Sequence, residues 1–504
     1  MTIPRASLFA VAALVVVTAV PFIGRAVISS DGAEVVGEAL GVVVNGDFSF
    51  GRTPLPPGDA MVTGAPFHSM YGLFPSLLPL TFLAPAWPFR LALGAPLLDA
   101  VVSLTWWLGT FLAALAFLAL ARTLSPGASP FWAPAFVAGT FLWPYAADSY
   151  SEPYAAAAIA FAAALILRSP ARPASAAALW GLACLLKPLL WVTVPVAILA
   201  LTLGRRDVIR NFARATAVFA SALAVQGVVN FFRTGSFLEV GYGDVVLRFT
   251  TPLAHGLWGL LASPGRSLFL YAPLCLVGLV AVRRLSAPAL ALCVLTPVVH
   301  LLVVARWWTW EGGSAWGPRY LLPILPLLAA PALLAPRWMG RAAVAIGVAV
   351  NLSGVVIAAG SWIGYAEALR PSAGSSWSPM GPVRVSEIPA LSPVKGHWIL
   401  LLRNVAGRDV RVSLPSGVSE GMPLPDAPES VSPWILRRAL GLPPLRPMIP
   451  RILVRSGAGF LARGEPLRAL ALARAAEQLA PEDPDSRRIA AAAKELIRRR
   501  AAAY

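Results

Sequence analysis

Acidic side chains stand directly behind the first long apolar segment of the chain. Residues 8–28 are apolar, and Asp31, Glu34 and Glu38 follow shortly after them. Their i/i+3 and i/i+4 spacing would bring these carboxylates to neighbouring positions on one helix. A carboxylate where a membrane helix leaves the bilayer is costly to hold near hydrocarbon, so it is a candidate functional group. Such a group can deprotonate a hydroxyl or bind a divalent ion.

Four further segments contain residues suited to chemistry at a membrane surface. A second acidic loop precedes the apolar segment 153–167, a single lysine ends another apolar segment, and two arginine-containing loops follow later, one of them rich in tryptophan. Their candidate residues are Asp148, Glu152, Lys187, Arg266, Trp308, Glu311, Trp316 and Arg319. Lysine and arginine neutralise phosphate oxygens, and aromatic rings stack on sugars or anchor at the headgroup level. The set predicts chemistry with a phosphate leaving group, in which Lys187, Arg266 and Arg319 are the charge-based candidates for the phosphate.

Each of these residues also has a simpler explanation. Asp31 could be a helix N-cap, and Glu34 and Glu38 could be solvated surface groups. Glu152 precedes a proline at a helix start, where a carboxylate complements the helix dipole, and Lys187 could extend to the interface. The tryptophans could form an interfacial belt. Histidines of the outer segments, His68, His255 and His397, are more often hydrogen-bonded surface groups than ligands.

The composition indicates a polytopic membrane protein. Of 504 residues, 57% are hydrophobic and 13% are charged, and apolar runs of about 20 residues, long enough to cross a bilayer, recur along the chain. The net charge of +17 comes largely from arginines in short loops and in the C-terminal tail, without a basic stripe interleaved with aromatics, so nucleic-acid binding is not expected. The three cysteines lie inside apolar segments without metal-ligand spacing and are interpreted as small buried hydrophobic residues.

Arginine-rich short loops predict the topology. If these loops face the cytoplasm, about eleven crossings fit a cytoplasmic N-terminus. The expected spans are residues 8–28, 93–121, 130–145, 153–167, a short span ending near 187, 188–203, 213–232, 267–282, 287–304, 320–334 and 342–363. Residues 71–88 contain four prolines and are predicted to be juxtamembrane or re-entrant. Every acidic or aromatic loop, and the chain after about residue 361, then lies on the extracytoplasmic side of a bacterial plasma membrane.

The chain divides into three predicted parts. Residues 1–365 form a transmembrane catalytic domain, and residues 366–450 form an irregular extracytoplasmic segment rich in proline, serine and glycine. Residues 451–504 form a helical hairpin, with helices over 460–479 and 486–500, that is similar to one tetratricopeptide unit. A single unit buries little surface alone, so we expect it to pack on the membrane domain or on a partner.

The order of these features resembles the GT-C superfamily of integral-membrane glycosyltransferases. The resemblance covers residues 1–365 and rests on the acid after the first span, the stretch Tyr71-Gly-Leu-Phe-Pro-Ser-Leu-Leu, the second acidic loop and the late Trp-Gly-Pro-Arg. These enzymes use polyprenyl-phosphate sugars and include protein mannosyltransferases, aminoarabinose transferases and arabinofuranosyltransferases. The resemblance implies an all-α, multi-pass GT-C-like bundle of about eleven transmembrane helices with juxtamembrane helices.

The resemblance also implies roles for individual residues. Asp31 would be the general base. Many members carry an Asp-Glu pair at this point, and Glu34 could take the place of the glutamate of that pair. Asp148 or Glu152 would be the acid of the second acidic loop. That second acid would bind a divalent metal such as Mg²⁺ or Mn²⁺, or position the acceptor. Contacts to the acceptor or sugar are expected from His68, Tyr71, Trp308, Glu311 and Trp316.

The expected reaction is the inverting transfer of a hexosyl or pentosyl group from a polyprenyl-phosphate donor to a hydroxyl of a glycan, lipid or protein acceptor of the cell envelope. The alternative is another polytopic protein that handles polyprenyl-linked glycans, either a ligase or a flippase or transporter. Transporters bind their substrates near the bilayer midplane and often contain paired repeats. Here the polar residues gather at one face and no repeat is visible.

Overall fold

The computed structural model describes most of the chain beyond its first residues. The described residues are 30–46, 72–148, 150–168, 172–203, 207–239, 248–313, 315–357, 361–363, 366, 377–378, 381–382, 387, 389–406, 431, 434–440, 442, 447–462 and 464–502. The predicted first span, residues 8–28, and the candidates His68 and Tyr71 lie outside this description, as does the side chain of Asp31.

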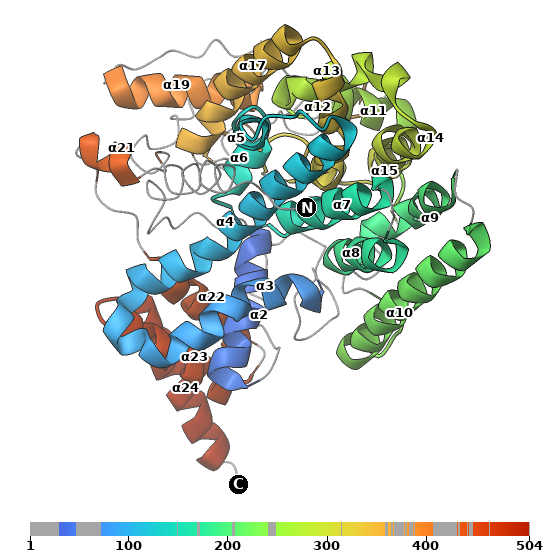
Figure 1. The fold of residues 1–504 in the computed structure, drawn as a ribbon. Coiled ribbons are helices and arrows are strands. Elements are labelled where there is room, and N and C mark those ends of the chain that lie inside the picture. The colour runs from blue at the N-terminus through green and yellow to red at the C-terminus, as the bar shows by residue number, and fades with distance from the viewer. Residues whose placement is uncertain are drawn as a thin grey trace.

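The described residues are almost entirely helical, and their longest helices have membrane-spanning length (Figure 1). The first half contains α2 (Ser30–Asn45), α3 (Leu73–Ala86), η2 (Trp87–Phe89), α4 (Arg90–Leu124), α5 (Trp132–Ala138), α6 (Leu142–Tyr145), α7 (Glu152–Leu167), α8 (Pro173–Leu186), η3 (Pro188–Thr193), α9 (Val194–Thr202) and α10 (Val208–Thr234). The second half of the bundle contains α11 (Leu253–Ala262), α12 (Leu268–Tyr271), α13 (Pro273–Val280), η5 (Val282–Arg284), α14 (Ala287–Leu290), the π-helical turn η6 (Ala291–Leu295), α15 (Thr296–Arg306), η7 (Arg319–Ile324), α16 (Leu325–Ala329), η8 (Ala330–Leu334) and α17 (Arg337–Val356).

Among the residues that the structure describes, four helical stretches are long and apolar enough to cross a membrane by their length and composition. They are Leu73–Leu124, Val208–Thr234, Ala287–Arg306 and Arg337–Val356. Shorter apolar helices accompany them at Glu152–Leu167, Pro173–Leu186, Pro188–Thr202, Leu253–Ala262 and Arg319–Leu334. The fold is that of a polytopic helical membrane protein, as the composition predicts, and the count of about eleven crossings stays a prediction.

Proline and glycine set the breaks between helices. Lys187 ends α8 in an extended conformation because it precedes Pro188, and the chain then reverses as expected there. The 3₁₀ turn η2 lies between α3 and α4, so the juxtamembrane piece predicted over residues 71–88 corresponds to α3 and the start of this turn. Gly94, with a φ of 66°, kinks α4 near its beginning. The predicted span 130–145 is wrong as one helix: it is broken into the short helices α5 and α6 around Gly139.

The consecutive helices place the loops at alternating ends of the bundle. Helices α7 and α8 are joined by a short loop and pack along each other, and α8 also packs on α10. At one end, Arg284 donates to the carbonyl of Leu334, so two of the predicted cytoplasmic loops are adjacent. The start of α7, the end of α8 and the start of η7 meet at the opposite end.

Small residues allow the helices that carry the site to pack closely. A Cβ atom at Gly109 of α4 would lie 2.7 Å from the ring of Tyr154, whose hydroxyl donates to the carbonyl of Thr105. A Cβ atom at Gly347 of α17 would lie 2.0 Å from the carbonyl oxygen of Gly139. Close backbone approach at small residues is a common basis of helix association in membranes, and here it fixes α7 and α17 against their neighbours.

The C-terminal region forms three helices rather than the predicted hairpin. They are α22 (Met448–Ala462), α23 (Pro466–Leu479) and α24 (Pro484–Ala502), and Gly464, with a φ of 74°, separates the first two. Helices α22 and α23 pack on α2 and on the first part of α4, and α24 packs on α22 and α23 (Figure 1). The carboxylate of Asp99 in α4 accepts hydrogen bonds from the backbone N–H groups of Met448 and Ile449, which joins the tail to the membrane domain.

The segment between the bundle and the tail contains short elements. They are β1 (Trp377–Ser378), β2 (Gly381–Pro382), η10 (Pro389–Leu391), α19 (Pro393–Ala406) and α21 (Trp434–Ala439), and β1 pairs antiparallel with β2. Helix α19 packs against α17, where His397 Nδ1 lies 3.2 Å from the carbonyl oxygen of Ser353. The prediction of an irregular segment therefore missed one helix that belongs to the bundle's packing.

Candidate functional site

A buried ion cluster joins the second acidic loop to the two later basic segments. Glu152 opens α7 with a side chain that is 1% exposed, and its Oε1 lies 2.9 Å from Lys187 Nζ and 3.7 Å from Arg319 Nε. Burying an unpaired carboxylate would cost several kcal/mol of desolvation free energy. The attraction to Lys187 and Arg319 offsets this cost. The three side chains come from three separate segments, and their contact confirms that these segments share one end of the bundle.

The cluster places one carboxylate beside two cations, Lys187 and Arg319, which it attracts. Glu152 Oε2 accepts no hydrogen bond of good geometry from the described part of the chain. The Lys187 side chain is 20% exposed, so the cluster is accessible from one side.

Aromatic rings orient Arg319 within the cluster. Its guanidinium carbon lies 4.6 Å from the ring centroid of Tyr150 and 4.7 Å from that of Tyr320, and Nη2 donates a 2.8 Å hydrogen bond to the Tyr320 hydroxyl. Stacking and hydrogen bonding together restrict the guanidinium to one plane. Tyr150, which lies inside the second acidic loop, was not among the predicted site residues, although its place two residues before Glu152 is a usable signal.

Arg266 binds the loop before Arg319. Its Nη1 donates to the carbonyls of Ala315 and, at 3.1 Å, Gly317, and its Nη2 donates to the carbonyl of Gly313. The prediction that Arg266 joins Lys187 and Arg319 at one phosphate is therefore corrected, because its guanidinium already serves the backbone of this loop. Arg266 instead positions the segment that ends in Arg319.

The tryptophan-rich loop contributes to the core as well as to the surface. Trp316 is 1% exposed, donates a 2.9 Å hydrogen bond to Asn351 Oδ1 and packs against Tyr271 and His397. The expectation that Trp316 contacts a sugar is corrected, because its ring is enclosed by protein. Trp308 and Glu311 are half-buried in the same loop, and their contact with acceptor or sugar stays a prediction.

Metal binding at Asp148 and Glu152 does not fit the arrangement of charges. Asp148 is half-buried in the turn before α7, and Glu152 faces two cations that would repel a divalent ion. No group of three or more His, Cys, Asp or Glu side chains suited to a metal occurs in the residues that the structure describes. We therefore derive no step through a metal at this pair.

The first acidic segment is helical, as its spacing predicts. Asp31 lies in the first turn of α2, and Glu34 is half-buried one turn later. The interpretation of Glu38 as a solvated group is wrong: its side chain is 0% exposed, and Oε1 accepts a 2.9 Å hydrogen bond from Arg233 Nη2. Its Oε2 accepts a 2.5 Å hydrogen bond from Ser76 Oγ.

The contacts of Glu38 connect α2 to two other elements. Arg233 lies in the last turn of α10 with a side chain that is 7% exposed, and Ser76 lies in α3. A charged residue at the end of a long apolar helix is a signal that sequence reasoning could have used for Arg233. Its partner is separated from it by 195 positions, and no local pattern predicts such a pair.

The fold and these charged clusters define a multi-pass helical membrane protein with a polar site at one end of its bundle. No family model matches the sequence, and no curated protein is similar to it at a significant level. Among solved structures, the chain is similar to ArnT from Cupriavidus metallidurans bound to undecaprenyl phosphate, with a TM-score of 0.48 and 13% identity, over 99% of this chain and 79% of that chain. The apo state of ArnT gives a TM-score of 0.48 and 12% identity, over 97% and 77%. Similarity of this size does not establish a shared family, substrate or activity.

Proposed function

We propose that this protein is a membrane glycosyltransferase of the GT-C type, which transfers a sugar from a polyprenyl-phosphate donor to an acceptor hydroxyl. The observation that carries the proposal is the buried cluster of Glu152, Lys187 and Arg319 at one end of an apolar helical bundle. Two cations beside one carboxylate suit a lipid phosphate that arrives from the membrane side. The sequence resemblance described above supplies the reaction type.

The transfer requires a base for the acceptor hydroxyl and two cations at the leaving phosphate. A base removes the proton of the acceptor hydroxyl, the hydroxyl oxygen attacks the anomeric carbon, and the bond from that carbon to the phosphate oxygen breaks. The phosphate leaves with the electron pair as polyprenyl phosphate, whose second ionisation adds negative charge. Lys187 and Arg319 stabilise that developing charge, because fixed cations in a dry site favour the transition state over the ground state.

Asp31 is the proposed base and Glu152 the acid that positions the acceptor. Asp31 lies in the first turn of α2, the helix that Glu38 fixes to α3 and α10. In-line displacement would invert the anomeric centre. The site would face the extracytoplasmic side of a bacterial plasma membrane, since the arginine-rich loops lie at the other end of the bundle.

Sugar transfer can be measured with purified protein and synthetic polyprenyl-phosphate sugars. Release of polyprenyl phosphate with an acceptor extract is the expected result, and Asp31→Asn should abolish it while the protein still folds. The amide keeps the size of the side chain but cannot take the proton. Movement of intact donor across vesicles without release of phosphate would instead identify a flippase. Full turnover by the Asp31→Asn variant would exclude Asp31 as the base.

A further inference from the structure

A cavity of about 590 Å³ lies at the end of the bundle opposite to the cluster around Glu152. Its walls come from the loop that follows α4, from the beginnings of α5 and α17, and from the end of η8. Leu333 and Ala335 line it, on either side of the carbonyl that accepts a hydrogen bond from Arg284. The cavity therefore belongs to the end at which the predicted cytoplasmic loops meet.

The charged residues that line this cavity are two arginines. Arg337 opens α17 and Arg341 follows four residues later, which places both on one face of the helix, and both are exposed. Neither guanidinium takes part in a hydrogen bond or an ion pair within the described part of the chain, and no carboxylate is among the lining residues described there. Like charges at this spacing repel each other, so an anion held between them removes that repulsion.

Other contacts hold the walls of the cavity in place. Arg122 Nε donates a 3.3 Å hydrogen bond to the carbonyl of Ala128, which fixes the loop after α4. A Cβ atom at Gly340 would lie 2.6 Å from the ring of Trp132, so α5 and α17 meet closely beside the cavity. Its shape is thus maintained by groups other than the two arginines that line it.

The remaining residues around the arginines suit the headgroup level of a bilayer. Ser125 and Ser129 line the cavity with hydroxyl groups, which can donate hydrogen bonds to phosphate oxygens. Phe131, at the cavity, and Trp338, next to Arg337, are each 70% exposed. Aromatic side chains are enriched where the membrane meets water, so these two indicate that the cavity opens at the membrane surface.

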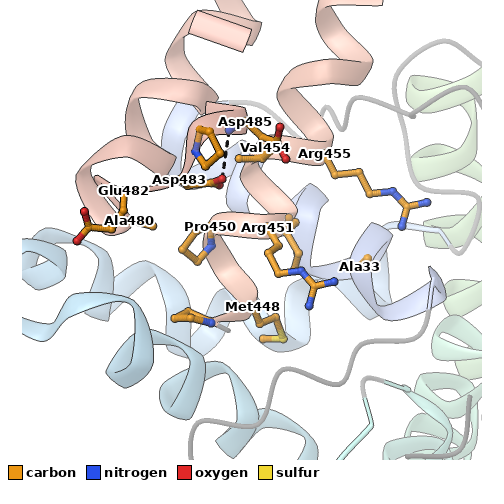
Figure 2. Close-up of a pocket in the computed structure, with 13 residues that line it drawn as sticks. Ala33, Met448, Pro450, Arg451, Val454, Arg455, Ala480, Glu482, Asp483 and Asp485 are labelled. Carbon is orange, nitrogen blue, oxygen red and sulfur yellow. Dashed lines mark hydrogen bonds between the residues drawn. The ribbon is translucent and has the colours of Figure 1, made fainter. Parts of the chain in front are cut away.

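The cavity between α2 and the C-terminal helices has a different charge (Figure 2). Among the described residues its lining contains more carboxylates than guanidinium groups. They are Glu482, Asp483 and Asp485 against Arg451 and Arg455. A cavity of this composition does not concentrate positive charge, so the cavity beside α17 is the better anion site.

We infer that the cavity beside α17 binds the phosphate of an anionic phospholipid. The phosphate would lie between Arg337 and Arg341, because guanidinium groups form paired, charge-assisted hydrogen bonds with phosphate oxygens. A volume of about 590 Å³ accommodates a headgroup while the acyl chains stay in the bilayer. Anionic lipids give the cytoplasmic leaflet its negative potential, and basic pockets between membrane helices bind their headgroups. This site is separate from the cluster proposed to hold the donor phosphate.

The test measures equilibrium binding of acyl-labelled phosphatidylglycerol and phosphatidylcholine to the full-length protein in a neutral detergent. The double variant Arg337→Gln, Arg341→Gln is compared with Arg214→Gln, Arg283→Gln, in which two exposed arginines outside the cavity lining are replaced. A further variant, Gly127→Trp, narrows the cavity and keeps both arginines. Gly127 lines the cavity, and a Cβ atom there would meet no described atom within 4 Å.

The native chain should bind phosphatidylglycerol at least about tenfold more tightly than phosphatidylcholine. The double variant and Gly127→Trp should each weaken phosphatidylglycerol binding by about tenfold or more, whereas the Arg214→Gln, Arg283→Gln control should leave it unchanged. Gel filtration verifies that each variant is folded.

Several results would overturn the inference. Equal affinity for the two lipids would exclude recognition of the anion, and equal loss in the control would reduce the effect to general surface charge. Unchanged binding in Gly127→Trp would place the lipid outside the cavity. If glycerol 3-phosphate displaces the label as effectively as short-chain phosphatidylglycerol does, the occupant is a soluble phosphate ligand. These measurements do not involve sugar transfer, so their failure leaves the proposed function to its own test.

Discussion

Replacing Glu38 with alanine removes a carboxylate that joins three helices. Glu38 is fully buried in α2 and contacts Arg233 of α10 at 2.9 Å and Ser76 of α3 at 2.5 Å. The variant leaves the Arg233 guanidinium, which is 7% exposed, without this partner. It also leaves a cavity in place of the side chain.

The expected cost follows from the burial of both partners. Breaking a buried ion pair by removing one side typically costs about 3–5 kcal/mol, because the remaining charge stays desolvated. That range lowers the folding equilibrium constant roughly 100- to 4000-fold, since each 1.4 kcal/mol is a factor of ten. Removing Arg233 as well should relieve much of the loss, because no uncompensated charge then remains.

The assay is equilibrium unfolding of the purified protein in mixed micelles of increasing SDS content, followed by tryptophan fluorescence. The matched control is Glu495→Ala in α24, whose carboxylate is 39% exposed and pairs with exposed arginines. Such surface pairs contribute about 0–1 kcal/mol. If Glu38→Ala destabilises the protein no more than Glu495→Ala does, the pair is not buried as described and the positioning of α2 must be argued differently.

Three other substitutions test separate parts of the structure. Gly347→Ala should lower the folded yield sharply, because the new Cβ would lie 2.0 Å from the backbone carbonyl oxygen of Gly139. Gel filtration measures the amount of folded protein, and a normal yield would contradict the close packing of α5 and α17. Arg266→Gln should lower turnover at unchanged donor binding, since the loop before Arg319 loses its backbone contacts, and a selective loss of donor binding would restore Arg266 as a phosphate ligand. Asp99→Leu should make the C-terminal helices more sensitive to protease, because the carboxylate holds the start of α22, and an unchanged digestion pattern would refute that role.

Local sequence patterns predicted which segments meet at the same end of the helical bundle. The reversal at Lys187 follows from the proline after it, and the alternation of apolar segments brings Glu152, Lys187 and Arg319 to one end of the bundle. The helix after the first apolar segment follows from the spacing of its acids. These inferences need only the order of the segments and the stereochemistry of single residues.

The contacts of Arg266 and the burial of Trp316 depend on packing between distant segments, which the sequence did not predict. The side chain of Arg266 could reach either a ligand or a loop backbone, and only the folded loop around Gly313 decides between them. Trp316 is buried because Asn351 provides a hydrogen-bond partner in a helix far along the chain. Glycine separates the tail into three helices at Gly464, whereas the alanine-rich sequence alone favoured a simpler hairpin.

The central claim is that the phosphate of a lipid-linked donor binds between Lys187 and Arg319. The most direct measurement is the affinity of the protein in nanodiscs for undecaprenyl phosphate, compared between the native chain and Lys187→Gln, with Lys494→Gln in α24 as the control for a lost charge. We predict a loss of about tenfold or more for Lys187→Gln and none for Lys494→Gln. Equal affinity of the native chain and Lys187→Gln would contradict the account.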